Sequence, residues 1–440
     1  MGTGHILTSS SDLSPSVAPS TLRFTTAGSV DDGKSTLIGR LLLDAKVLLE
    51  DQLASVARTT ERRGAPAGGT ANGLDLSLFT DGLTSEREQG ITIDVAYRYF
   101  ATPRRRFIIA DTPGHEQYTR NMVTGSSTAD LSVILVDATR GISQQTRRHV
   151  AVASLLAIPR IVVAVNKMDQ VGWDRAVFEE IAADFAAVAH SLGLVNITLI
   201  PLSALEGDMV VTRGDRLDWY EGPTLLDVLE TAPAGIPARD LRFPVQLVSR
   251  SRFGGRQEHR GYLGRIESGT ITVGETVVAW PHGLEARVAD IVTLDGSLHC
   301  ASAGRSVTVV LDRQVDVARG DLLSHAYDAP SVVRRFRARL TWLDRDPLSR
   351  GRRYWLKHGT QMVRASIESL DSRLDLTTLQ PDAAAQTLAF NDIGTVRIGV
   401  ARPLIADAYA ANRATGSFIL IDEATHHTVA GGMIAEVTNG

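Results

Sequence analysis

The first half of the chain alternates short, continuous apolar runs with longer stretches of mixed polarity. The apolar runs are rich in Val, Ile and Leu, as strands are when both faces of a sheet are covered. They lie at residues 22–27, 107–110, 130–138, 160–166 and 197–203. Apolar runs that alternate with helical stretches are typical of a parallel sheet. The pattern therefore predicts an α/β domain over residues 21–236.

The pattern changes after residue 240. The later apolar runs are short and are separated by Gly and Asp; they lie at residues 260–280, 286–294, 306–311 and 336–343. Such runs are typical of small all-β barrels or sandwiches. Residues 232–240 have the composition of a linker, and a second boundary near 329–335 divides the β region. We expect two β-barrel domains, at residues 240–328 and 332–440.

Composition and the N-terminal residues narrow the class of protein. Residues 1–20 contain six Ser and two Pro but no Lys or Arg, which favours a disordered tail over a signal peptide. A net charge of -4 gives no general attraction to nucleic acid or anionic membrane. No apolar run reaches the roughly 20 residues that span a bilayer, and the single cysteine, Cys300, fits a reducing compartment. We expect a cytoplasmic protein without nucleic-acid or membrane partners.

A phosphate-binding motif follows the first apolar run. The sequence GSVDDGKST, residues 28–36, fits the pattern G-x-x-x-x-G-K-S between a strand and a helical stretch, the context that this motif requires. The backbone N–H groups of residues 31–36 and the helix N-terminus would bind the β-phosphate. Lys34 would bridge the β- and γ-phosphates, and the Ser35 hydroxyl would bind Mg²⁺.

Three further motifs each follow a predicted strand: DTPGH at 111–115, NKMD at 166–169 and SAL at 203–205. Asp111 is placed to reach Mg²⁺ through water, and the Gly114 N–H to meet the γ-phosphate. Asp169 can accept hydrogen bonds from N1–H and the exocyclic amine of guanine, and adenine lacks these donors. Four motifs in this order predict a GTPase with GTP and Mg²⁺ as its cofactors.

The residues expected to bind the nucleotide come from all four motifs. They are Gly28, Ser29, Val30, Asp31, Asp32, Gly33, Lys34, Ser35, Thr36, Asp111, Thr112, Pro113, Gly114, His115, Asn166, Lys167, Met168, Asp169, Ser203, Ala204 and Leu205. Lysine usage supports this set, because two of the four lysines of an otherwise arginine-rich chain lie in it. Arginine's planar fork does not replace lysine's compact charge. The role of Lys357, in the pattern YWLKHG, stays open.

A long polar stretch separates the phosphate motif from Glu86. It includes residues 58–73, whose Gly and Ala content predicts a mobile loop. The sequence EREQGITID follows it and places Thr92 as the switch residue that contacts Mg²⁺ and the γ-phosphate while GTP is bound. Ser35, Thr92 and Asp111 are therefore the expected metal ligands.

With these motifs and two β domains, the chain resembles the translational GTPase superfamily, which includes elongation factor Tu. The resemblance runs from about Leu22 to the C-terminus. It implies that His115 positions the attacking water, that Val30 and Ile91 form an apolar gate in front of it, and that Asp31 supports catalysis. The expected catalytic residues are His115, Lys34, Asp31 and Thr92.

Longer stretches are similar to the large, GTP-binding subunit of bacterial sulfate adenylyltransferase. They lie at residues 28–42, 86–100, 111–138, 219–230 and 354–360. This resemblance implies a small catalytic subunit that binds ATP and sulfate and forms adenosine 5′-phosphosulfate and pyrophosphate, driven by GTP hydrolysis on the large subunit. Only Lys34 among the four lysines precedes Ser or Thr, so we expect no fused adenylylsulfate kinase of the P-loop type.

Two alternatives remain open from the sequence. A translation factor that binds tRNA or the ribosome is favoured by the three-domain plan and by the arginine clusters at 104–106 and 350–353. The net negative charge of the chain and the switch sequence EREQGITID argue against a translation factor. A relative of the sulfate-activating enzymes that serves a specialised sulfation pathway is the second alternative.

Overall fold

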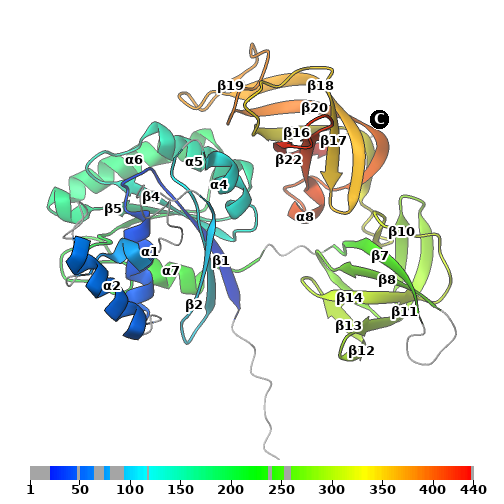
Figure 1. Cartoon of the computed structure of the whole chain (residues 1–440), viewed down its shortest axis with the longest axis horizontal. Helices are drawn as coiled ribbons and strands as arrows, with labels where there is room; N and C mark the ends of the chain where they lie inside the picture. Colours follow the sequence, from blue (N-terminus) through cyan, green and yellow to red (C-terminus); the bar gives the residue numbers. More distant parts are fainter. Residues whose placement is uncertain are drawn as a thin grey trace, which may run out of the picture.

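The chain folds into an α/β unit followed by two barrels of β-strands (Figure 1). The computed structural model describes residues 20–46, 50–63, 74–79, 94–115, 118–235, 240–251 and 259–437. The order of an α/β unit and two β units confirms the fold class that the hydrophobic pattern predicts. Among the described residues, no helix has the length and apolar character that crossing a bilayer requires.

A six-stranded sheet with the order β2-β3-β1-β4-β5-β6 forms the centre of the α/β unit. Its strands are β1 (Thr21–Ala27), β2 (Ala96–Ala101), β3 (Arg106–Asp111), β4 (Leu131–Asp137), β5 (Ile161–Asn166) and β6 (Ile197–Pro201). Neighbours pair in parallel except β2 with β3. Every residue of β4 and β5 is buried, as their continuous apolar runs predict. Because β3 and β4 flank β1 on opposite sides, the loop after β1 opens where doubly wound sheets bind ligands.

Helices cover both faces of this sheet, and successive residues of β4 enter opposite cores. Leu135 packs with α1 (Lys34–Asp44) and α7 (Leu225–Thr231). Ile134 packs on the other face, where the helices are α4 (Thr119–Ser126), α5 (Gln144–Leu155) and α6 (Arg175–Ser191). The unit also contains α2 (Glu50–Arg63), η1 (Leu76–Phe79) and η3 (Met168–Val171). Both faces of the sheet are therefore covered by helices, and the polar loops lie where the strands end.

The prediction of a mobile loop over residues 58–73 is wrong for its first part, because α2 continues to Arg63. Val56 and Thr60, one helical turn apart, are both buried. The Thr60 hydroxyl donates to the Val56 carbonyl (2.9 Å) and accepts from the N–H of Asp75 (3.0 Å). Three predicted segments lie outside the described residues: the tail at 1–19, the stretch 64–73, and 80–93 with Ile91 and Thr92.

The first barrel closes through the pairing of β10 with β11. Its strands are β7 (Phe243–Ser251), β8 (His259–Arg265), β9 (Thr270–Thr272), β10 (Thr276–Trp280), β11 (Leu284–Thr293), β12 (Gly296–Leu298), β13 (Cys300–Ser302), β14 (Ser306–Leu311) and β15 (Leu322–His325). Phe243, Tyr262 and Val309 fill its centre.

The second barrel closes in the same way, through the pairing of β17 with β18. Its elements are β16 (Ser331–Trp342), β17 (Arg353–His358), β18 (Gln361–Leu374), β19 (Pro381–Asp382), β20 (Ile393–Ala406), α8 (Arg413–Gly416), β21 (Ser417–Asp422) and β22 (Thr428–Val437). Phe336, Leu356 and Ile398 lie in its core.

The second barrel contacts the α/β unit through polar groups at α4 and α5. The Tyr409 hydroxyl donates to the Leu156 carbonyl (3.1 Å), and Arg413 donates to the Ala129 carbonyl (2.9 Å). Arg120, on α4, donates to the backbone of the second barrel. A cavity of about 810 Å³ lies at this contact, and Lys357 is among its lining residues. Since α4 follows the DTPGH motif along the chain, this barrel lies against an element next to the predicted site.

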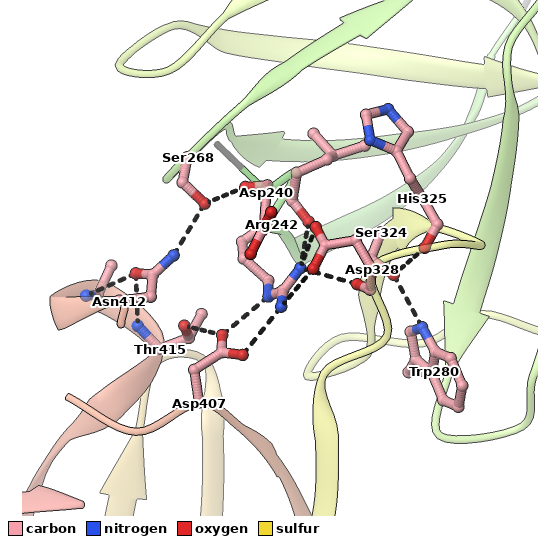
Figure 2. Close-up of polar contacts among 12 residues, drawn as sticks. Asp240, Arg242, Ser268, Trp280, Ser324, His325, Asp328, Asp407, Asn412 and Thr415 are labelled. Atoms are coloured by element: carbon pink, nitrogen blue, oxygen red, sulfur yellow. Dashed lines mark hydrogen bonds and ion pairs between the residues drawn. The ribbon is translucent and has the colours of Figure 1, made fainter. Parts of the chain in front are cut away.

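Arg242 joins the two barrels (Figure 2). Its guanidinium is 4% exposed and donates to Asp328 (2.9 and 3.2 Å) and to Asp407 (2.8 and 2.9 Å). Burial alone would lower the pKa of Arg242. The hydrogen bonds to the two carboxylates have the larger combined effect, so the pKa lies above its usual value and the side chain stays charged. Nearby, the Asn412 amide donates to the Ser268 hydroxyl (2.8 Å). One buried cation therefore holds two carboxylates from separate segments.

Replacing Arg242 by Ala leaves Asp328 and Asp407 without their cation. We expect Arg242→Ala to lower the free energy of unfolding of the β region by about 3–5 kcal/mol, the usual cost of removing one partner of a buried ion pair. Urea denaturation followed by tryptophan fluorescence measures this loss. The control is Arg265→Ala, since Arg265 is 49% exposed and pairs with Glu267 at the surface, where a pair contributes about 0–1 kcal/mol. Equal losses in the two variants would rule out Arg242 as the link between the barrels.

Candidate nucleotide-binding site

Polar loops meet at the C-terminal edge of the central sheet. The register of the sheet sets Thr26 of β1 level with Asp111 of β3, and Asp137 of β4 level with Asn166 of β5. The Thr26 hydroxyl donates to Asp111 (3.1 Å), and the Thr112 hydroxyl donates to the Thr26 carbonyl (2.6 Å). The motifs brought together at this edge are those at residues 28–36, 111–115, 166–169 and 203–205.

The loop at residues 28–36 has a backbone shaped for close approach of a ligand. Asp31 (φ 70°) and Gly33 (φ 91°) both adopt left-handed conformations, which cost free energy for a residue other than Gly and cluster at functional sites. Gly33 precedes α1, and a Cβ there would collide with the side chain of Asn166. The first N–H groups of α1 have no partner within the helix and can bind an anion.

Lys34 is buried beneath this loop. Its ammonium donates to the carbonyls of Gly28 (2.9 Å) and Ser29 (3.1 Å). Burial lowers the pKa of Lys34, while the carboxylates of Asp111 and Asp32 act in the opposite direction. Burial also raises the pKa of Asp32. A desolvated cation beside free helix N–H groups makes this loop a site for an anion such as phosphate.

Gly114 and His115 lie beside the phosphate loop. A Cβ on Gly114 would press on the Gly28 carbonyl and on the Lys34 ammonium, so the backbone of the DTPGH motif contacts the loop. The His115 side chain is half-buried and lies edge-on to the ring of Tyr118, with 6.2 Å between ring centroids. The DTPGH motif thus lies next to the loop that is predicted to bind the phosphates.

Asn166 connects three loops. Its amide nitrogen donates to the Asp32 carbonyl (2.8 Å) of the phosphate loop, and its amide oxygen accepts from the Ala204 N–H (2.9 Å). The neighbouring Asp169 accepts from the Ser203 hydroxyl (2.6 Å). The NKMD and SAL motifs are therefore hydrogen-bonded to each other and to the phosphate loop.

Lys167 is held by a carboxylate that sequence reasoning missed. Its ammonium pairs with Asp137 (2.7 Å), which is 2% exposed, and its own backbone is left-handed (φ 65°). Burial raises the pKa of Asp137, but hydrogen bonds from Lys167 and Thr139 outweigh burial and lower it. The position of Asp137 at the end of a buried strand was a signal that could have found it.

Two more residues support the site and escaped the sequence motifs. Arg40 of α1 donates to the carbonyls of Ala204 (3.1 Å) and Leu205, which fixes the SAL loop. Gln145 of α5 donates to the Gly114 carbonyl (2.9 Å). No local sequence spacing indicates either residue, because each donates to a carbonyl more than 30 residues away along the chain.

The remaining predicted residues line the same loops. Val30, Ser35, Thr36 and Leu205 are half-buried, Asp31 is exposed, and Thr112, Pro113, Met168, Ser203 and Ala204 are buried. Among the described residues, no group of three or more His, Cys, Asp or Glu side chains could hold a metal alone. The donors present are a hydroxyl and a carboxylate, Ser35 and Asp111. Such a set fits Mg²⁺, which takes one or two protein oxygens and completes its shell with phosphate and water.

Removing the Asn166 amide leaves the Asp32 carbonyl and the Ala204 N–H without a partner. Each buried group left unpaired costs about 1–3 kcal/mol, so Asn166→Ala lowers the free energy of unfolding by that order and weakens nucleotide binding. Urea denaturation and GTP titration calorimetry measure the two effects. Asn196→Ala is the matched control, because Asn196 is exposed before β6. If both variants behave alike, Asn166 does not connect the loops.

Two family models match parts of this chain. Residues 20–234 match the family described as elongation factor Tu GTP binding domain, and residues 335–435 match the GTP-eEF1A C-terminal domain-like family. A solved structure of Sup35 in complex with GDP aligns over 96% of this chain and 95% of its own, at 21% identity and a TM-score of 0.43.

Relatives with much higher identity cover nearly the whole chain. Sulfate adenylyltransferase subunit 1 of Cellvibrio japonicus is 48% identical over 417 residues, which is 94% of this chain and 86% of that protein. The bifunctional enzyme CysN/CysC of Mycobacterium tuberculosis is 50% identical over 94% of this chain and 67% of its own length. The bifunctional enzyme NodQ of Rhizobium sp. (strain BR816) is 49% identical over 94% of this chain and 64% of its own length. The chain spans about two thirds of these two bifunctional relatives.

The family expected from the sequence is confirmed by the relative from Cellvibrio japonicus, which matches this chain over most of both lengths. The word subunit in its name also implies a partner subunit. The chain therefore belongs to the sulfate adenylyltransferase subunit 1 family of GTPases, with an elongation factor Tu-type GTP-binding domain.

Proposed function

We propose that this chain binds GTP with Mg²⁺ and that its GTP hydrolysis drives formation of adenosine 5′-phosphosulfate on a separate small subunit. The observation that carries the nucleotide assignment is the bond of Asn166 to the Asp32 carbonyl (2.8 Å). It ties the loop that would read the base to the loop that would bind the phosphates. One connected set of side chains can therefore bind both ends of a guanine nucleotide.

Guanine selection rests on Asp169. Its carboxylate offers acceptors for N1–H and the exocyclic amine of guanine, and the Ser203 hydroxyl (2.6 Å) orients it. Asn166 can bond the opposite base edge, and the Lys167 stem can cover the ring while Asp137 holds its ammonium. Adenine presents no donors to Asp169, so the carboxylate keeps only the Ser203 hydroxyl as a partner and adenine is rejected.

The phosphates would be bound by the positive groups of the first loop. Lys34 would meet the β- and γ-phosphates, with the N–H groups of residues 31–36 around the β-phosphate and the Gly114 N–H at the γ-phosphate. Ser35, Asp111 and Thr92 are the proposed ligands of Mg²⁺. The metal ion, when bound, supplies positive charge that neutralises the β- and γ-phosphates.

His115 is the proposed residue that orients the attacking water. The backbone of the preceding residue, Gly114, lies against the phosphate loop, and the His115 ring is half-buried. Val30, on the loop, and Ile91 are proposed to form the apolar gate that restrains the ring before activation. Asp31, exposed and left-handed in the same loop, is proposed to support the hydrolytic step.

The proposed use of this hydrolysis follows from the chemistry of the coupled reaction. ATP and sulfate give adenosine 5′-phosphosulfate and pyrophosphate, and the product contains a phosphate–sulfate anhydride of high energy. The reaction needs an energy source, which GTP hydrolysis on this chain can supply. ATP and sulfate would bind to the small catalytic subunit, in a heterodimer or a higher assembly in the cytoplasm.

RNA binding is the second candidate function, and one observation favours it. A cavity of about 800 Å³ on the second barrel is lined by four arginines, Arg334, Arg335, Arg353 and Arg364. Arg335 and Arg364 are already paired with glutamates. The net charge of the chain is negative, which leaves RNA binding the weaker candidate.

Changing Asp169 to Asn tests guanine selection. The new amide oxygen can still accept from N1–H, but its nitrogen meets the exocyclic amine of guanine donor to donor, so GTP affinity falls by an amount on the order of 10⁴-fold. The same amide can donate to the C2 oxygen of xanthine, and xanthosine triphosphate becomes the better ligand. Titration calorimetry with both nucleotides measures the change, with Asp184→Asn, an exposed position on α6, as control. Unchanged GTP affinity in Asp169→Asn would remove this residue from the base site.

Phosphate release from GTP by this chain mixed with the small sulfate adenylyltransferase subunit tests the coupling. With ATP present, we expect the rate to rise when sulfate is added and adenosine 5′-phosphosulfate to accumulate. Omission of sulfate, or of the small subunit, is the control. If the rate does not change with sulfate or with the small subunit, and rises instead with tRNA or ribosomes, RNA binding replaces this proposal.

A further inference from the structure

Gln145 of α5 uses every hydrogen-bonding group of its side-chain amide. The amide nitrogen donates to the Gly114 carbonyl (2.9 Å) and lies 3.0 Å from Nε2 of His149. The amide oxygen accepts from the Arg148 guanidinium (2.8 Å). An amide has two N–H donors and one oxygen, so these three contacts define a single orientation. The reversed amide would set its oxygen against a carbonyl and its N–H groups against a cation.

The contact with His149 requires a neutral imidazole. A protonated ring carries N–H on both nitrogens, and Nε2 could not then accept from the Gln145 amide. Burial, aided by the charges of Lys34 and Arg148, lowers the pKa of His149 to about 3. Its ring is 1% exposed, and its Nδ1 has no hydrogen-bond partner among the described residues. The ring is therefore a fixed neutral acceptor for Gln145 at physiological pH.

The helix that carries Gln145 is itself tied to the phosphate loop. Ser143 caps α5 in a reciprocal capping box with Thr146, and its hydroxyl lies 3.2 Å from that of Ser29. Gln145 is therefore held by Arg148 and His149 of its own helix, and Ser143 ties the start of that helix to the phosphate loop. A side chain fixed in this way can set the position of the group that it contacts.

The group it contacts is the peptide that links Gly114 to His115. A rotation of this peptide moves the N and Cα of His115 and hence the origin of its side chain. On its other side Gly114 lies close to the phosphate loop, since a Cβ there would meet Gly28 and Lys34. The bond from Gln145 thus determines where the His115 side chain begins.

We propose that Gln145 is a positioning residue for GTP hydrolysis, which fixes His115 through the Gly114 carbonyl, with His149 orienting the Gln145 amide. This inference rests on the proposed role of His115 as the residue that orients water. Gln145 contacts neither base nor phosphate in this assignment. Its loss should therefore act on the hydrolytic step and leave nucleotide affinity unchanged.

The first test replaces Gln145 by Met, which keeps the length of the side chain and removes both donors. We expect kcat for GTP hydrolysis in the complex with the small subunit to fall about 10²-fold, the effect of a misplacement of roughly 1 Å, with KM for GTP within twofold of its original value. Gln145→Glu keeps the shape, turns an acceptor toward the Gly114 carbonyl and lowers kcat further. The matched control is Gln144→Met, at the exposed preceding position, which changes neither constant.

A double variant separates positioning from general damage. If Gln145 acts through His115, then His115→Ala combined with Gln145→Met hydrolyses GTP no more slowly than His115→Ala alone. Multiplied losses in the double variant, or a loss of GTP affinity in Gln145→Met, would overturn the inference. So would an unchanged kcat in Gln145→Met. An unchanged kcat in His115→Ala would instead reject the proposed role of His115.

Discussion

The nucleotide site depends on one side chain at the end of a buried strand. Asn166 reaches the phosphate loop through the Asp32 carbonyl and the SAL loop through the Ala204 N–H, so three loops from distant parts of the chain share one amide. The register of the parallel sheet makes this possible, because it sets Asp137 and Asn166 side by side. The sheet in turn is fixed by continuous apolar strands that pack on both faces. A local polar arrangement is thus the product of the whole hydrophobic core.

Charge is concentrated at the same edge. Lys34 is buried, and its ammonium is balanced by nearby aspartates and by loop carbonyls. The charge of Lys167 is balanced by Asp137.

The second barrel lies against α4, the helix that follows His115, through Arg120 and through its own Tyr409 and Arg413. The second barrel thus contacts the helix that follows the DTPGH motif, and Arg242 links it to the first barrel.

Much of this organisation could be predicted from the sequence, because the information was local. Continuous apolar runs predicted β4 and β5, and the spacing of GSVDDGKST predicted the loop before α1. The contacts of Arg40, Asp137 and Gln145 could not be read in the same way, since each depends on which distant segments the fold brings together. The Arg242 junction escaped prediction for that reason. The prediction of a mobile loop over residues 58–73 was wrong where α2 continues to Arg63. It rested on the Gly and Ala content of residues 64–73 and did not take into account the burial of Val56 and Thr60.

The most direct test of energy coupling is the final yield of adenosine 5′-phosphosulfate rather than a rate. This chain and the small subunit are incubated with ATP and sulfate until the yield is constant, with GTP in one reaction and GDP in the other. Coupling predicts a higher yield with GTP, together with phosphate released in fixed proportion to the product. Equal yields with GTP and GDP would mean that hydrolysis on this chain does not drive the reaction.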